Sequence, residues 1–219
     1  MRFFPIHTRD DLARMVQEVG LIPLFSCGIP GWSVEEHCDP SVWFTDREGP
    51  WEWKGQLAAR KDCVYGKLLR GKNAFVSMEW FPVLANYRRD GYDFEGRCDD
   101  GLAPYKDKLL MAYLEGHAPV QSRIAKRECG FSKGYDTVLT RLEMQTYVVN
   151  QDFVYSVDKQ GKPYGWGNAL LTTPEKWLGE TLVNSGDACK PEASMERLVE
   201  HLGRLMPDVD RKAILRELR

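Results

Sequence analysis

The chain has 219 residues, of which 43% are hydrophobic and 28% charged, and its net charge is −2. This composition is ordinary for a globular protein; it excludes a membrane span, because no stretch approaches about 18 apolar residues, and it excludes nucleic-acid binding by overall charge alone. The start of the sequence lacks a secretory signal and its six cysteines form no C-x-x-C pair, so we expect a cytoplasmic protein with reduced thiols, no metal site and no cofactor.

Residues 1–103 predict an N-terminal α/β region. Thr8 with Asp11 three residues later is typical of a helix start, and Gly20 is typical of a helix end. Residues 63–69 and 74–78 predict two short strands joined by the polar turn RGKN. Residues 79–89 then predict a helix with Pro82 in its first turn.

Residues 104–173 are organised more clearly. Pro104 opens one predicted helix, Ser122 caps a second and a third begins at about Tyr135. Residues 147–157, rich in β-branched and aromatic side chains, predict a strand that returns through residues 166–173. Three helices followed by a β-hairpin is the order of a winged helix-turn-helix.

Residues 174–219 predict a C-terminal helical tail. Apolar residues recur at helical spacing after Ser194, Pro207 breaks this helix, and Asp208 is in position to cap a last one. The predicted fold class is therefore α+β: a winged helix-turn-helix with an N-terminal α/β region and C-terminal helices.

Residues 51–89 combine aromatic side chains with positive charge. From Lys54 to Arg89 eight Lys or Arg face two acids, Asp62 and Glu79, which gives a local charge of +6. Seven aromatic side chains are interleaved, namely Trp51, Trp53, Tyr65, Phe75, Trp80, Phe81 and Tyr87. Cations neutralise phosphates and aromatic faces stack on bases, so the segment suits nucleic acid; the alternative is that its aromatic side chains build the core.

The winged-helix interpretation predicts how DNA would dock. The third helix would enter the major groove, and the hairpin tip would contact the backbone. The residues predicted near the start of that helix are Lys133, Tyr135, Thr137, Thr140 and Arg141, and those at the tip are Lys159, Gln160 and Lys162. Winged helices also serve as protein-interaction modules, and that alternative stays open.

Isolated carboxylates are the candidates for acid–base chemistry, because the common hydrolase and nucleotide-binding motifs do not occur. Glu52 lies between two tryptophans and Glu79 lies beside Trp80. Apolar rings raise a carboxyl pKa, which suits a general acid or a group that positions water. A surface ion pair is the alternative for both.

Several segments together resemble the AlkZ-related proteins of bacteria, over about residues 10–180. The matching segments are G-L-I-P-L-F, G-I-P-G-W-S-V-E-E, W-F-T-D-x-x-G-P-W-E-W-K, Y-G-K-L-L-R-G-K, F-V-S-M-E-W-F-P, N-Y-R-R-D-G-Y-D-F, T-R-L-E-M-Q-T-Y-V and G-K-P-Y-G-W-G. These proteins are a divergent branch beside the AlkZ DNA glycosylases, a superfamily of winged-helix units that removes alkylated or crosslinked bases.

The resemblance implies DNA as the partner and a DNA glycosylase as the related enzyme. It implies that Trp51 and Trp53 stack on a damaged base, that Glu52 or Glu79 positions water, and that phosphates are held by Lys54, Lys67, Arg70, Arg88 and Arg89. AlkZ enzymes carry a catalytic Gln-x-Gln element that this chain lacks. The alternatives are therefore an enzyme that uses a carboxylate, a non-enzymatic winged-helix regulatory protein, or a protein-interaction module.

Overall fold

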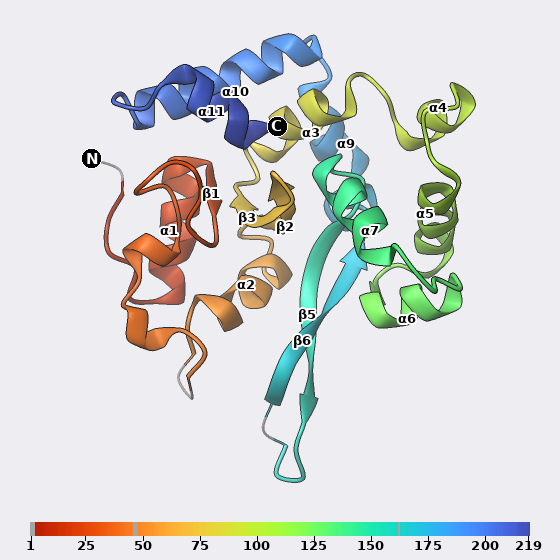
Figure 1. The fold of residues 1–219 in the computed structure, drawn as a ribbon, viewed down its shortest axis with the longest axis horizontal. Coiled ribbons are helices and arrows are strands. Elements are labelled where there is room, and N and C mark those ends of the chain that lie inside the picture. The colour runs from red at the N-terminus through yellow and green to blue at the C-terminus, as the bar shows by residue number, and fades with distance from the viewer. Residues whose placement is uncertain (1–2, 46–47, 162) are drawn as a thin grey trace.

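The computed structural model describes residues 3–45, 48–161 and 163–219, and it confirms the predicted α+β class (Figure 1). A six-stranded antiparallel sheet with the strand order β1-β3-β2-β5-β6-β4 runs through the molecule. Its strands are β1 (Leu21–Pro23), β2 (Val64–Leu69), β3 (Lys72–Val76), β4 (Val120–Gln121), β5 (Val149–Val157) and β6 (Pro163–Thr172). The sheet joins the two halves of the chain, because β2 pairs with β5 through Tyr65 and Asn150.

The N-terminal half begins with helix α1 (Arg9–Val19), as predicted. Thr8 and Asp11 form a capping box, and the chain leaves the helix at Gly20 with φ 80°. Two short 3₁₀ helices follow, η1 (Glu35–His37) and η2 (Pro40–Val42). The predicted hairpin of β2 and β3 is confirmed, although β3 begins two residues earlier than expected.

One core holds this half together. Trp32 is fully buried, and its indole nitrogen donates to the Leu21 carbonyl at 2.8 Å. The same core includes the apolar face of α1, the β2–β3 hairpin and residues from the C-terminal helices. The core also contains Tyr65, Phe75 and Phe81. These aromatic side chains of segment 51–89 therefore build the core, which was the alternative to nucleic-acid binding.

Two helices in this half were not predicted: α2 (Pro50–Ala59) and α4 (Phe94–Asp99). Helix α2 is buried on most of its surface, so its sequence shows no amphipathic repeat. Helix α4 has six residues, none of them buried, and Asp93 caps it by accepting from the Gly96 amide at 2.7 Å. Between them lies the predicted helix α3 (Phe81–Arg89).

The middle of the chain contains α5 (Tyr105–His117), α6 (Ser122–Glu128) and α7 (Tyr135–Met144), followed by the β5–β6 hairpin. Strand β4, between α5 and α6, pairs with β6. A second core, which includes Leu110, Leu114, Val138 and Leu142, lies among these helices. Gln121 is the residue at the N-cap of α6, so the prediction that Ser122 caps it was wrong by one residue.

Four helices and a 3₁₀ turn complete the chain: α8 (Pro174–Leu178), α9 (Glu180–Val183), η3 (Asn184–Gly186), α10 (Pro191–Leu205) and α11 (Arg211–Leu218). Helix α10 packs on α3, where the Asn86 amide donates to Ser194 Oγ at 2.8 Å. Asp210 rather than Asp208 caps α11, because the side chain of Asp210 accepts from the Lys212 amide. No helix within the described ranges has the length and apolar content needed to cross a bilayer.

Candidate nucleic-acid interface

Three of the residues expected to contact DNA lie in the interior. The side chain of Tyr135 is 3% exposed and its hydroxyl donates to the Ser122 carbonyl at 2.9 Å. Arg89 is 7% exposed and donates to Glu175 Oε1 at 2.6 Å and to the Thr146 carbonyl at 2.8 Å. Lys54 is also buried, at 1% exposure. These side chains contribute to packing and present no surface to a phosphate in this structure.

Two more of the expected arginines are held by structural contacts. Arg141 makes two hydrogen bonds to the buried carboxylate of Asp107, one of them 2.7 Å from Nε to Oδ2. Arg88 donates to the carbonyls of Leu68 at 3.1 Å and Arg219 at 2.9 Å, and burial lowers its pKa to about 10. Lys162, expected at the hairpin tip, lies outside the described residues.

The β2–β3 hairpin packs against α7. Lys67 Nζ donates to Thr140 Oγ1 at 2.9 Å, and the Gly71 amide donates to Met144 Sδ at 2.9 Å. Arg70 lies on the turn of this hairpin with its side chain 44% exposed. Lys133 is exposed in the loop before α7. The outer surface of α7 is therefore flanked by positive charge from two distant segments.

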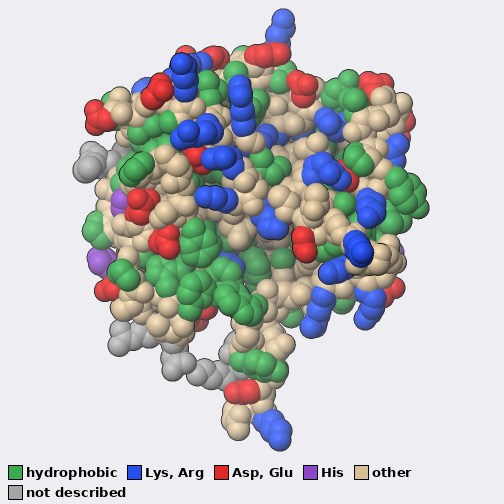
Figure 2. Space-filling view, in the orientation of Figure 1, with side chains coloured by type: hydrophobic (Ala, Val, Ile, Leu, Met, Phe, Trp, Pro, Cys, Tyr) green, Lys and Arg blue, Asp and Glu red, His purple; other side chains and the backbone are tan. Residues whose placement is uncertain are grey.

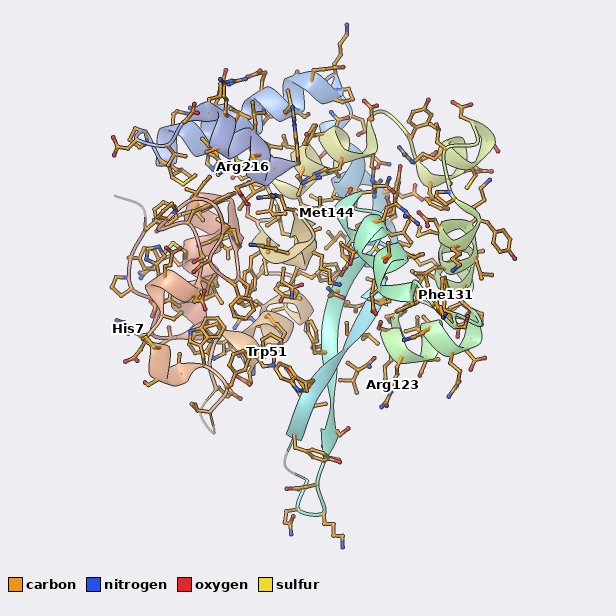
Figure 3. The ribbon with its side chains drawn as sticks, viewed as in Figure 1. His7, Trp51, Arg123, Phe131, Met144 and Arg216 are labelled. Atoms are coloured by element: carbon orange, nitrogen blue, oxygen red, sulfur yellow. The ribbon has the colours of Figure 1, made fainter. Side chains whose placement is uncertain are left out.

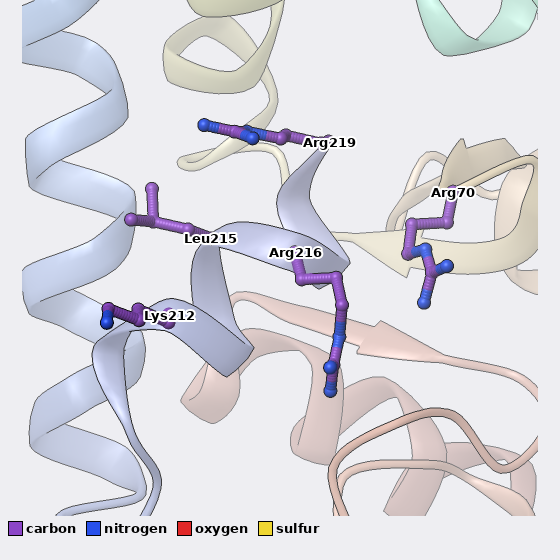
Figure 4. A pocket seen from close by; sticks show the side chains of 5 residues that line it. All are labelled: Arg70, Lys212, Leu215, Arg216 and Arg219. Carbon is purple, nitrogen blue, oxygen red and sulfur yellow. The ribbon is translucent and has the colours of Figure 1, made fainter.

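The C-terminal helix adds cations that the sequence did not single out. A surface hollow of about 360 Å³ is lined by Arg70, Lys212, Leu215, Arg216 and Arg219 (Figure 4). The buried carboxylate of Glu217 accepts from Arg70 at 2.9 Å and lies 3.7 Å from Arg216, which connects α11 to the β2–β3 turn. Acids in the tail offset its basic residues in number, so only the fold reveals that four cations line one hollow.

Lys and Arg side chains are spread over the face that Figure 2 shows, from the C-terminal helices to α6 and α7. Figure 3 places Arg216, Met144 and Arg123 across the same view. We call the surface that carries Arg123 and Arg216 the basic front face. We count with it Arg70 and Lys212, which line one hollow with Arg216, and the cations that flank α7, Lys67 and Lys133.

Three aromatic rings from distant segments meet around Trp51, which Figure 3 labels to the left of Arg123. The ring centroids of Trp51 and Trp166 are 5.0 Å apart and nearly perpendicular, and Phe44 lies 5.3 Å from Trp51 and 5.8 Å from Trp166. The Trp166 side chain is 73% exposed and Phe44 57%. We call these three residues the aromatic platform.

Lys54 lies behind the platform. Its Nζ is 3.7 Å from the centroid of the Trp51 ring, donates to the Trp51 carbonyl and is 3.4 Å from the Tyr155 hydroxyl. Burial lowers the pKa of Lys54 to about 7, with a smaller opposing effect from the Glu52 carboxylate. This amine changes charge near neutral pH beside the Trp51 ring.

The two predicted catalytic carboxylates have different surroundings. Glu52 Oε2 accepts from the Gly49 amide at 2.9 Å, which caps α2, and the carboxylate influences the pKa of Lys54 and Tyr155. Glu79 is exposed in the turn before α3, where the neighbouring Trp80 stacks on His201. Trp53, expected to stack on a base, is 6% exposed and belongs to the first core.

A third carboxylate, Glu143 on α7, is buried where the two halves of the sheet meet. Its Oε1 accepts from Asn150 Nδ2 at 2.8 Å, and burial raises its pKa to about 7. Glu143 Oε2, Asn150 Oδ1 and the Tyr65 hydroxyl have no hydrogen-bond partner within the described ranges. The sequence alone carries no mark of this cluster, because three separate elements assemble it.

The family model AlkZ related matches residues 6–219, essentially the whole chain, so the protein belongs to the AlkZ-related family. No curated protein and no solved structure matches the chain.

Proposed function

We propose that residues 104–173 form a winged helix-turn-helix and that the chain binds duplex DNA through the basic front face. The observation that carries the proposal is the arrangement of α7. It follows α5, β4 and α6, precedes the hairpin, and is flanked by Lys67 of β2 and by Lys133 in the loop before it. Strands β4, β6 and β5 are neighbours in that order, which supports a wing built on a three-stranded sheet.

The contacts of α7 restrict which part of it would enter a groove. The β2–β3 turn occupies its C-terminal half through Thr140 and Met144. Its first turn is open, since Asp136 and Thr137 are exposed next to Lys133. We therefore assign groove contact to the start of α7 and phosphate contact to the cations beside it.

Most buried apolar residues of 104–173 form a core of their own, whereas 1–103 and 174–219 share the other one, to which strand β5 adds Val149. This supports residues 104–173 as the DNA-reading domain, with 1–103 as the N-terminal domain and 174–219 as a helical tail packed on it.

The family supports action on alkylated bases as the finer proposal. Glu52 is the candidate to position water, because it lies close enough to Lys54 and Tyr155 to affect the pKa of both. The lack of a Gln-x-Gln element favours a second candidate, a non-enzymatic DNA-binding protein. In both candidate functions, DNA would bind to the basic front face.

Binding of a fluorescent duplex, measured by polarisation across a salt series, tests the proposal. Affinity should fall linearly with salt on logarithmic axes, and Arg216→Glu or Lys133→Glu should weaken binding and reduce the slope by about one. Arg14→Glu is the matched control, since Arg14 is an exposed arginine on α1 that is not among the residues of the basic front face, and it should leave binding unchanged. Absence of salt-sensitive binding would refute the proposed function.

Release of a base from alkylated duplex separates the two candidates. Base release that is lost in Glu52→Gln assigns an enzyme in which Glu52 positions water, because Gln preserves the helix cap. DNA binding without base release assigns the non-enzymatic function.

A further inference from the structure

The aromatic platform exposes large apolar rings that the rest of the protein leaves uncovered. Trp166 and Phe44 are 73% and 57% exposed, and the half-buried Trp51 lies between them. Burying a tryptophan side chain would stabilise the fold, so three rings gathered at the surface need a reason.

Unusual backbone conformations occur at Phe44 and beside Trp166. Phe44 has φ 58°, a left-handed conformation that is strained for a bulky side chain. Trp166 lies between Gly165, which has φ 75°, and Gly167, where a Cβ would come within 2.7 Å of the Tyr155 ring. The β5–β6 ladder shifts register opposite this segment, and such bulges re-aim a side chain.

The charge around the platform indicates which partner would cover it. The platform lies on the same side of the molecule as the basic front face (Figures 2 and 3). An apolar protein partner would gain nothing from those cations, whereas a nucleotide supplies a flat ring for the platform and phosphates for the basic residues.

We propose that the aromatic platform stacks an unpaired nucleobase of a DNA strand whose flanking duplex lies on the basic front face. The proposal rests on the proposed function, since the duplex brings the base to the platform. It assigns stacking to Trp51, Trp166 and Phe44, and it leaves Trp53 in the core. Trp166 on the hairpin is the most exposed of the three rings, so we expect it to contribute most to stacking on the base.

Three duplexes of equal length test the proposal by polarisation: a fully paired one, one with a single-nucleotide bulge, and one in which the bulged nucleotide lacks its base. The protein should bind the base-bearing bulge about five- to 150-fold more tightly than the base-less bulge. Trp166→Ala should bring this ratio close to one without changing affinity for the paired duplex. Trp166→Phe should retain much of the ratio, because a flat ring remains.

Tyr105→Ala is the matched control, since Tyr105 is an aromatic residue 77% exposed on another element, and it should keep the wild-type ratio. Phe44→Ala gives a second variant should Trp166→Ala unfold in thermal melts. The proposal is overturned if wild type binds the base-bearing and base-less bulges equally, or if folded Trp166→Ala keeps the wild-type preference. In either case, binding of the paired duplex would leave the proposed function standing. Failure of all three duplexes to bind refutes the proposed function itself.

Discussion

Glu143 makes the stability of the protein depend on pH in a direction that can be calculated. Its pKa is raised from 4.5 to about 7 because burial disfavours the charged form. Between these two values the unfolded chain has lost the proton that the folded chain retains, so stability falls as pH rises. At about 1.36 kcal/mol for each pKa unit, the loss is about 3 kcal/mol once the pH exceeds both values.

Glu143→Gln removes this titration while keeping a side chain of the same size. We expect the free energy of unfolding of the variant, relative to wild type, to rise by about 3 kcal/mol between pH 4.5 and pH 8. Urea unfolding of both proteins at each pH measures this difference, and the other titrating groups cancel because both proteins share them. Glu95→Gln, which changes an exposed carboxylate, is the control. A difference between Glu143→Gln and wild type that is the same at both pH values would refute the assignment.

Substitutions at three further positions test other parts of the structure by urea unfolding. Burial lowers the pKa of Lys54 from 10.5 to about 7, so between these values the unfolded chain holds a proton that the folded chain has lost, and the protein becomes less stable as pH falls. Lys54→Met removes this titration. The variant should be more stable than wild type at pH 6, by at most about 5 kcal/mol, with the gain fading towards pH 10. Thr8→Ala should destabilise the protein by about 1 kcal/mol because α1 loses its capping box, and Thr8→Ser should restore most of that loss. Leu142→Ala should cost about 2–5 kcal/mol because it opens a cavity in the second core, and a loss below 1 kcal/mol would contradict that packing.

Local signals were sufficient for much of the fold. Thr8 and Gly20 mark both ends of α1, and the turn RGKN joins two strands, because caps and turns depend on a few consecutive residues. The three helices and hairpin of residues 104–173 have apolar positions that repeat at the correct period, so their order was predicted. Helix α2 escaped prediction because distant elements bury it on most sides.

The candidate site was less predictable, because charge in a sequence does not indicate depth. Lys54 and Arg89 belong to the basic segment, yet a Trp51 ring and the Glu175 carboxylate hold them in the interior. Arg216 belongs to a tail of balanced charge, yet it shares a hollow with Arg70. In each case, partners far along the chain decide whether a cation meets solvent.

The aromatic platform and the basic front face are built from different residues, so recognition of an unpaired base and affinity for duplex DNA can be lost separately. Phe44 and Trp51 come from the N-terminal half and Trp166 from the hairpin, so the platform exists only where the halves are docked. The cations do not depend on these rings, since Lys67 donates to Thr140 Oγ1 on α7 and Arg70 donates to Glu217 on α11. Loss of Trp166 therefore removes discrimination of an unpaired base while leaving duplex affinity, whereas loss of Arg216 weakens every duplex alike.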